Sequence, residues 1–84
     1  MNRDDIFEMP PYADRLKRLR EKRKLKRRVV AELCGLSKNM IARYENGEVE
    51  PKAAGLLILA DFYGVSVDFI LGREEKEKNF HFSP

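Results

Sequence analysis

A helix stop and a helix start lie two residues apart in the middle of the chain. Gly35 ends a short amphipathic pattern that begins near Arg27, and glycine allows the left-handed turn that closes a helix. Ser37 is a good N-cap, and Ile41 and Tyr44 follow it at helical spacing. Helices this short depend on packing against other elements for their stability. The pattern therefore predicts two short helices that meet at a tight turn inside a small helical domain.

Apolar spacing predicts an all-α fold, a compact domain of five helices. The expected helices cover about residues 12–23, 26–34, 38–46, 52–63 and 67–71. The second, third and fourth end at Gly35, Asn46-Gly47 and Gly64, and Ser66 caps the fifth. The expected organisation is a flexible N-terminal arm over residues 1–11, the helical domain over 12–72 and a charged C-terminal tail over 73–84.

Length and composition limit what else the chain can be. Its 84 residues make one domain with a small core, and its longest apolar run is far shorter than the about 20 residues that cross a bilayer. The charged N-terminus is unlike a secretory signal. One cysteine, Cys34, and one histidine, His81, cannot form an internal disulfide or supply four metal ligands. No nucleophile–base pair is evident, so we expect a cytoplasmic protein that is no enzyme and uses no cofactor.

Charge is unevenly distributed along the chain. Ten lysines and arginines and a single acid lie between Arg15 and Arg28, so this segment carries +9, whereas the rest of the chain carries −6. A compact basic patch on a small domain is typical of proteins that bind polyanions. A solvated helix face, or a basic amphipathic helix for a membrane surface or an acidic partner, would have the same composition.

The second short helix presents side chains suited to DNA. Its inner face is Ile41 and Tyr44, which leaves Lys38, Asn39 and Arg43 facing outward. An α-helix fits the major groove, where lysine and arginine pair with guanine N7 and O6 and asparagine pairs with adenine N6 and N7. These three residues are therefore the predicted base readers. Met40 is consistent either with contact to a thymine methyl group or with filling a gap between helices.

These features together resemble a known family. The residues that carry the resemblance are Arg20, Leu25, Val30, Ala31, Gly35, Ser37, Ile41, Tyr44 to Gly47, Pro51 and Gly64 to Gly72. Residues 16–72, about two-thirds of the chain, resemble the lambda-repressor-like helix-turn-helix domain of the Cro and xenobiotic-response-element type. The resemblance implies five helices, with helices 2 and 3 forming the helix-turn-helix. It also implies operator binding as a homodimer on palindromic half-sites.

The resemblance also assigns roles to individual residues. It places the base-reading positions at Lys38, Asn39 and Arg43. It also places Arg27 and Asn46 at the DNA backbone or flanking bases. The sequence itself adds Lys26, Arg28, Ser37 and Met40 to these expected contacts. Arg20 and Glu45 match a structural pair that links the first helix to the end of the third, so Arg20 is not expected to bind DNA.

Some positions depart from the family pattern. Lys26 and Arg27 stand where threonine or serine followed by glutamine is common, which raises non-specific attraction to phosphates. Lys24 replaces a frequent glycine, so the turn after the first helix is expected to differ. Glu48 and Glu50 are acidic where basic residues are frequent, and we expect them to turn away from the DNA backbone.

Two functions from different classes fit the sequence. The first is a sequence-specific DNA-binding transcriptional regulator, with repression expected, that inserts the third helix into the major groove. The alternative is a protein-interaction module, such as an antitoxin or adaptor of a bacterial or mobile-element system. It would hold a partner through Ile58 and Phe62 on the fourth helix, or through the tail. An exposed apolar pair at this spacing indicates a protein contact, although packing by the arm or tail explains it equally well.

Overall fold

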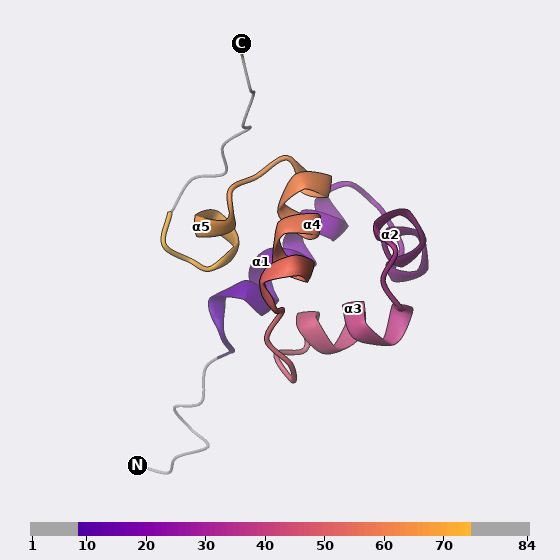
Figure 1. Ribbon diagram of the computed structural model, residues 1–84, viewed down its shortest axis with the longest axis horizontal. Helices are drawn as coiled ribbons and strands as arrows, with labels where there is room; N and C mark the ends of the chain where they lie inside the picture. The colour runs from indigo at the N-terminus through magenta and orange to yellow at the C-terminus, as the bar shows by residue number, and fades with distance from the viewer. Residues whose placement is uncertain (1–8, 75–84) are drawn as a thin grey trace.

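The structure, a computed structural model, describes residues 9–74 of the 84-residue chain. This part forms five helices: α1 (Pro11–Lys22), α2 (Arg27–Cys34), α3 (Lys38–Glu45), α4 (Ala53–Tyr63) and α5 (Val67–Ile70). In Figure 1, α2 and α3 pack together toward one end of the domain and α5 lies at the other. The predicted all-α, five-helix fold is confirmed. None of the described helices is long and apolar enough to cross a membrane.

The helix boundaries lie within about two residues of those expected from the sequence. α1 begins at Pro11, the last residue of the expected arm, because proline suits the first turn of a helix, where its missing N–H has no intrahelical partner. α3 and α5 each end one residue earlier than the apolar pattern suggests. Arm residues 1–8, and the tail beyond residue 74 with His81, lie outside the described residues.

Serine hydroxyls begin the two helices for which capping is predicted. Ser37 Oγ accepts a hydrogen bond from the Met40 N–H at 3.0 Å, and Ser66 Oγ accepts one from the Phe69 N–H at 2.9 Å. Each bond satisfies a backbone donor that has no partner within its own helix. The N-terminus of α3, which carries the predicted base readers, is thus fixed by its own sequence.

The turn after α1 keeps its left-handed backbone without glycine. Lys24 has φ +57°, and it is the one residue other than glycine with positive φ among those described. Its N–H donates to the Glu21 carbonyl at 2.9 Å, and the Leu25 N–H donates to the Arg20 carbonyl at 3.2 Å. Lysine here adopts the left-handed conformation that glycine favours, so the absence of glycine does not prevent this turn.

The core takes side chains from all five helices. The largest fully buried side chains are Leu19, Val30, Leu59 and Ile70. Ala31 is also buried, at 3% exposure, and its small side chain suits the close approach of α2 and α3. The core therefore stabilises α2 and α3, which are too short to be stable as isolated helices.

Of the two residues predicted to form an exposed apolar pair on α4, only Ile58 is exposed. Ile58 is 40% exposed, but Phe62 packs partly buried against the core and its ring meets Tyr63 edge-on at 5.0 Å between centroids. The larger exposed apolar side chains are Leu57 on α4 and Leu33 on α2, which are 61% and 66% exposed. Phe62 packs partly against the core, so less of its surface is exposed than that of Ile58.

Alkaline pH tests the burial of Tyr63. Burial, with a smaller effect of the Glu45 carboxylate, raises the pKa of the Tyr63 hydroxyl above its usual value of about 10. Above that pH the unfolded chain loses the phenolic proton while the folded protein keeps it, so stability falls as pH rises. We expect Tyr63→Phe to lose less free energy of unfolding than the wild type between about pH 8 and pH 11. Urea denaturation at both pH values measures this, and equal losses would contradict it.

Candidate nucleic-acid interface

α2 and α3 are joined by a tight turn that fixes their crossing. Gly35 ends α2 with φ +70°, and the Leu36 N–H donates to the Ala31 carbonyl at 2.9 Å. Ile41 and Tyr44 then bury the inner face of α3, with 2% and 7% of their surfaces exposed. Because this side of α3 is anchored in the core, its opposite side is directed to solvent.

The three predicted base readers all lie on that solvent side. Lys38, Asn39 and Arg43 are exposed. Within residues 9–74, no side-chain hydrogen bond or ion pair holds Lys38 or Asn39. Arg43 forms a half-exposed ion pair with Glu48, with 3.7 Å between its Nε and Glu48 Oε1. The arrangement presents donors and an amide along one edge of a helix, as base recognition in a major groove requires.

The residues expected at the DNA backbone divide into two groups. Those with exposed positions are Lys26, Arg28, Ser37 and Asn46. Met40 is partly buried and packs against the core. The Asn46 side-chain amide donates to Glu48 Oε2 at 3.4 Å. Glu48 therefore lies against the end of α3, in contact with Asn46 and Arg43.

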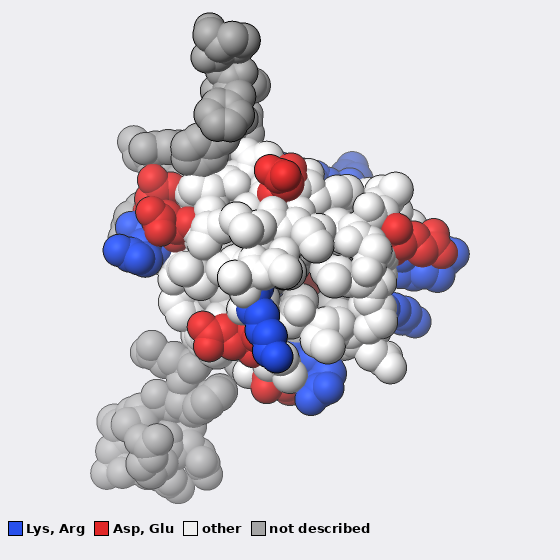
Figure 2. Space-filling view, viewed as in Figure 1, with Lys and Arg blue, Asp and Glu red and all other residues white. Residues whose placement is uncertain are grey.

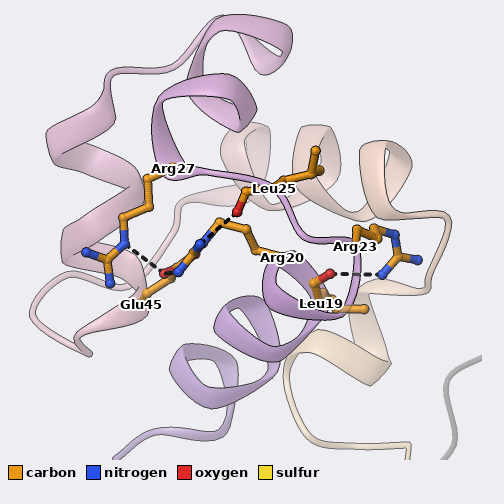
Figure 3. Close-up of polar contacts among 6 residues, drawn as sticks. All are labelled: Leu19, Arg20, Arg23, Leu25, Arg27 and Glu45. Atoms are coloured by element: carbon orange, nitrogen blue, oxygen red, sulfur yellow. Dashed lines mark hydrogen bonds and ion pairs between the residues drawn. The ribbon is translucent and has the colours of Figure 1, made fainter.

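One buried carboxylate joins α1, α2 and α3 (Figure 3). Glu45 has a side chain only 1% exposed, and it accepts hydrogen bonds from Arg20 Nε and Nη2 at 2.8 and 2.9 Å. Arg27 Nε donates to the same carboxylate at 3.0 Å. Arg20 Nη1 also donates to the Leu25 carbonyl at 2.9 Å. The hydrogen bond to Glu45 raises the pKa of Arg20, so Arg20 stays charged beside a buried acid.

Arg27 thus has a structural partner that its sequence position does not reveal. The predicted Arg20–Glu45 pair is present, but Arg27 shares the carboxylate and is not devoted to DNA. Its Nε is engaged, whereas its two terminal nitrogens have no hydrogen-bond partner among the described residues. Its side chain remains 32% exposed. Glu45 therefore holds the Arg27 guanidinium in place while leaving two donors for an outside acceptor.

A basic hollow of about 500 Å³ opens between α1 and the starts of α2 and α3. It is lined by Lys17, Arg20, Glu21, Lys26, Arg27, Arg28 and Lys38. Lys17 comes from α1 and was not among the predicted contact residues. The basic run in the sequence includes it, but periodicity alone does not tell which outward residue of α1 meets α2 and α3. Six cations around one hollow, with a single acid, suit an anionic group such as a phosphate.

The side of the molecule on which α4 lies in front is different in character. Figure 2 shows that this side is largely uncharged, with lysine and arginine gathered toward its edges. The exposed side chains of Leu57 and Ile58 belong to α4. Charge is thus concentrated around the α1–α2–α3 hollow and is sparse over α4. No described group of three or more His, Cys, Asp or Glu is placed to hold a metal ion.

A short helix, a tight turn and a second helix with a buried inner face and an exposed polar outer face define a helix-turn-helix unit. The family model for the helix-turn-helix domain matches residues 11–69 of this chain. The chain belongs to the lambda-repressor-like helix-turn-helix family, and the prediction from its sequence is confirmed.

Relatives of known sequence come from Bacillus subtilis (strain 168). The HTH-type transcriptional regulator AnsR is 37% identical over 65 residues, which cover 77% of this chain and 56% of AnsR. The uncharacterized HTH-type transcriptional regulator YobD is 43% identical over 61 residues, 73% of this chain and 54% of YobD. The chain spans about half the length of these curated relatives.

Two solved structures share the fold. The P22 c2 repressor protein, in complex with the synthetic operator 9T, matches with a TM-score of 0.73 and 25% identity, covering 81% of this chain and all of that one. A transcriptional regulator from Listeria innocua matches with a TM-score of 0.71 and 29% identity, covering 87% of this chain and 68% of that one.

Proposed function

We propose that this domain is the DNA-binding part of a sequence-specific transcriptional regulator and that α3 enters the major groove of double-stranded DNA. The observation that carries the proposal is the exposure of Lys38, Asn39 and Arg43 on one side of a helix whose other side is buried. Arginine, lysine and asparagine are the side chains that pair with guanine and adenine edges. The likeness to a repressor seen in complex with an operator supports the same reading.

The basic hollow supplies the sequence-independent part of binding. Its cations neutralise backbone phosphates on either side of the groove that α3 enters. Arg27 is suited to this role because Glu45 fixes its guanidinium and leaves two terminal nitrogens to donate. Lys17 extends the contact surface onto α1, so phosphates flanking the half-site meet side chains from three helices.

The proposal includes a homodimer on a palindromic operator, with repression as the regulatory outcome and the bacterial cytoplasm as the location. One α3 helix reads only a few base pairs, and a two-fold dimer doubles the contacts on a symmetric site. Selection of bound duplexes from a random DNA pool, followed by sequencing, tests this directly. A palindromic consensus with half-sites about 10 base pairs apart is expected. Recovery of no preferred sequence would contradict the proposal.

Replacing single basic residues separates base reading from phosphate binding. Arg43→Ala is expected to weaken binding to the selected duplex by about 1–3 kcal/mol, with little change on a scrambled duplex, because a base contact is lost. Lys26→Ala is expected to weaken both complexes alike and to reduce the slope of log K against log salt by about 1. Gel-shift titrations at several salt concentrations measure both effects.

Arg73→Ala is the matched control for Arg43→Ala. Arg73 is also an exposed arginine with an acidic partner, Asp68 at 3.9 Å, but it follows α5 and lies outside the interface. Its loss changes the net charge equally and is expected to leave discrimination between the two duplexes intact. If Arg43→Ala weakened the selected and scrambled complexes by the same factor, its base-reading role would be rejected.

A protein-interaction module is the second candidate function. The observation in its favour is the exposure of Leu57 and Ile58 on α4, the helix that lies in front on the largely uncharged side of the domain (Figure 2). Purification with a stoichiometric partner that is lost on Leu57→Glu, together with no selected DNA sequence, would favour this function over the first. Phe62 offers less surface to such a contact because its ring is partly buried against the core.

A further inference from the structure

Glu48 brings a negative charge to the end of the helix that is proposed to read DNA. Its Oε1 lies 3.7 Å from Arg43 Nε, and its Oε2 accepts a hydrogen bond from the Asn46 amide at 3.4 Å. One carboxylate therefore contacts a proposed base reader and a proposed backbone contact. An acid is unfavourable next to DNA phosphates, so its position against these two side chains calls for a reason connected with binding.

The backbone sets this position. The Glu48 N–H donates to the Arg43 carbonyl at 2.9 Å, and the Val49 N–H donates to the same oxygen at 3.4 Å. These bonds close the turn after α3 and hold the start of the Glu48 side chain beside Arg43. The ion pair itself is about half exposed on both partners, and such pairs contribute about 0–1 kcal/mol to stability. Folding alone therefore gains little from it.

We propose that Glu48 is a specificity-determining positioning residue that acts through Arg43. This inference rests on the proposed function. On an arbitrary sequence, Arg43 and Asn46 contact only phosphates. To do so they must break their contacts with the Glu48 carboxylate, whose negative charge then lies near the phosphates. On the preferred sequence, the two terminal nitrogens of Arg43 bind guanine bidentately while its Nε keeps the Glu48 carboxylate, so this cost is not incurred there. Glu48 thus weakens binding to arbitrary DNA more than binding to the preferred site. This difference increases the discrimination between the two DNA sequences.

The test compares Glu48→Gln with Glu50→Gln on two DNA probes. The probes are a duplex recovered by selection from a random pool and a scrambled duplex of the same length, with dissociation constants measured by fluorescence anisotropy. Glu48→Gln keeps the size of the side chain and removes its charge. We expect it to tighten scrambled DNA about fivefold, to change the selected duplex less than about twofold, and to steepen the salt slope on scrambled DNA by about 1.

Glu50 is the matched control. It is an exposed acid in the same loop, and it forms no hydrogen bond or ion pair with α3 in the described part of the chain. Glu50→Gln is expected to tighten both probes by one common factor, which leaves the ratio of their dissociation constants unchanged. An equal fall in this ratio for Glu48→Gln and Glu50→Gln would mean that only total charge matters and would overturn the inference.

A double variant tests whether the effect passes through Arg43. In an Arg43→Ala background, Glu48→Gln is expected to leave the ratio of the two dissociation constants unchanged. A fall in the ratio as large as in the wild-type background would overturn the inference. A wild-type protein that discriminates between the probes, with a ratio unaffected by Glu48→Gln, overturns the inference alone. A wild-type protein that binds neither probe, or both equally, overturns the proposed function with it.

Discussion

Replacing Glu45 with alanine is expected to lower the free energy of unfolding by about 3–5 kcal/mol. The change removes three hydrogen bonds and leaves Arg20, whose side chain is only 12% exposed, without its anionic partner in a partly buried site. Arg27 loses the same carboxylate. The total free energy of unfolding of a small domain is about 5–15 kcal/mol, so this loss is a large fraction of it. Urea denaturation followed by circular dichroism measures it.

Glu48→Ala is the control for this effect. It also removes a carboxylate that pairs with an arginine, but the partners are about half exposed, so a loss of about 1 kcal/mol or less is expected. The difference between the two variants isolates burial. If Glu45→Ala and Glu48→Ala cost the same free energy, the buried cluster would not be what holds α1, α2 and α3 together.

Gly72→Ala is expected to destabilise the domain by about 2–4 kcal/mol. Gly72 has φ +83°, a conformation that side chains disfavour, and an added Cβ would lie 2.6 Å from Pro11 Cβ and 3.0 Å from Pro11 Cγ. The proline ring cannot rotate away as a flexible side chain can. The chain after α5 would have to separate from the start of α1, and the same denaturation measurement reports the cost.

Gly35→Ala separates backbone strain from crowding. Gly35 has a similar φ of +70°, but nothing lies within 4 Å of an added Cβ. Its replacement is therefore expected to cost only the left-handed strain of about 1–2 kcal/mol. Equal losses for Gly35→Ala and Gly72→Ala would show that the contact with Pro11 carries no energetic weight.

Local patterns were sufficient to predict the helices. Ser37 and Ser66 act at the helix starts through hydrogen bonds to N–H groups three residues away, and Gly35 ends α2 through its own backbone. Such signals depend on neighbours in the sequence and so can be read from it. Lys24 shows the limit of this reading, because a residue that disfavours positive φ adopts it where the surrounding turn requires it.

The residues that make up the candidate interface are harder to predict from the sequence, because they are brought together by contacts between helices. Periodicity indicates which side of a helix faces outward, but it does not indicate which outward residues of different helices meet. The sequence therefore did not predict that Lys17 lines the basic hollow or that Arg27 shares the Glu45 carboxylate with Arg20. Phe62 turned toward the core for the same reason, since the space available to its ring is set by other helices.

The anchoring of α3 has a consequence for how such a domain diversifies. Ile41, Tyr44 and Glu45 hold the helix from within, whereas Lys38 and Asn39 contribute no side-chain hydrogen bond or ion pair to the described fold. Substitutions at these two positions are therefore expected to change stability little, so under the proposed function the target sequence can change in small steps. The residues proposed to read DNA and the residues that stabilise the fold thus lie on different sides of one eight-residue helix.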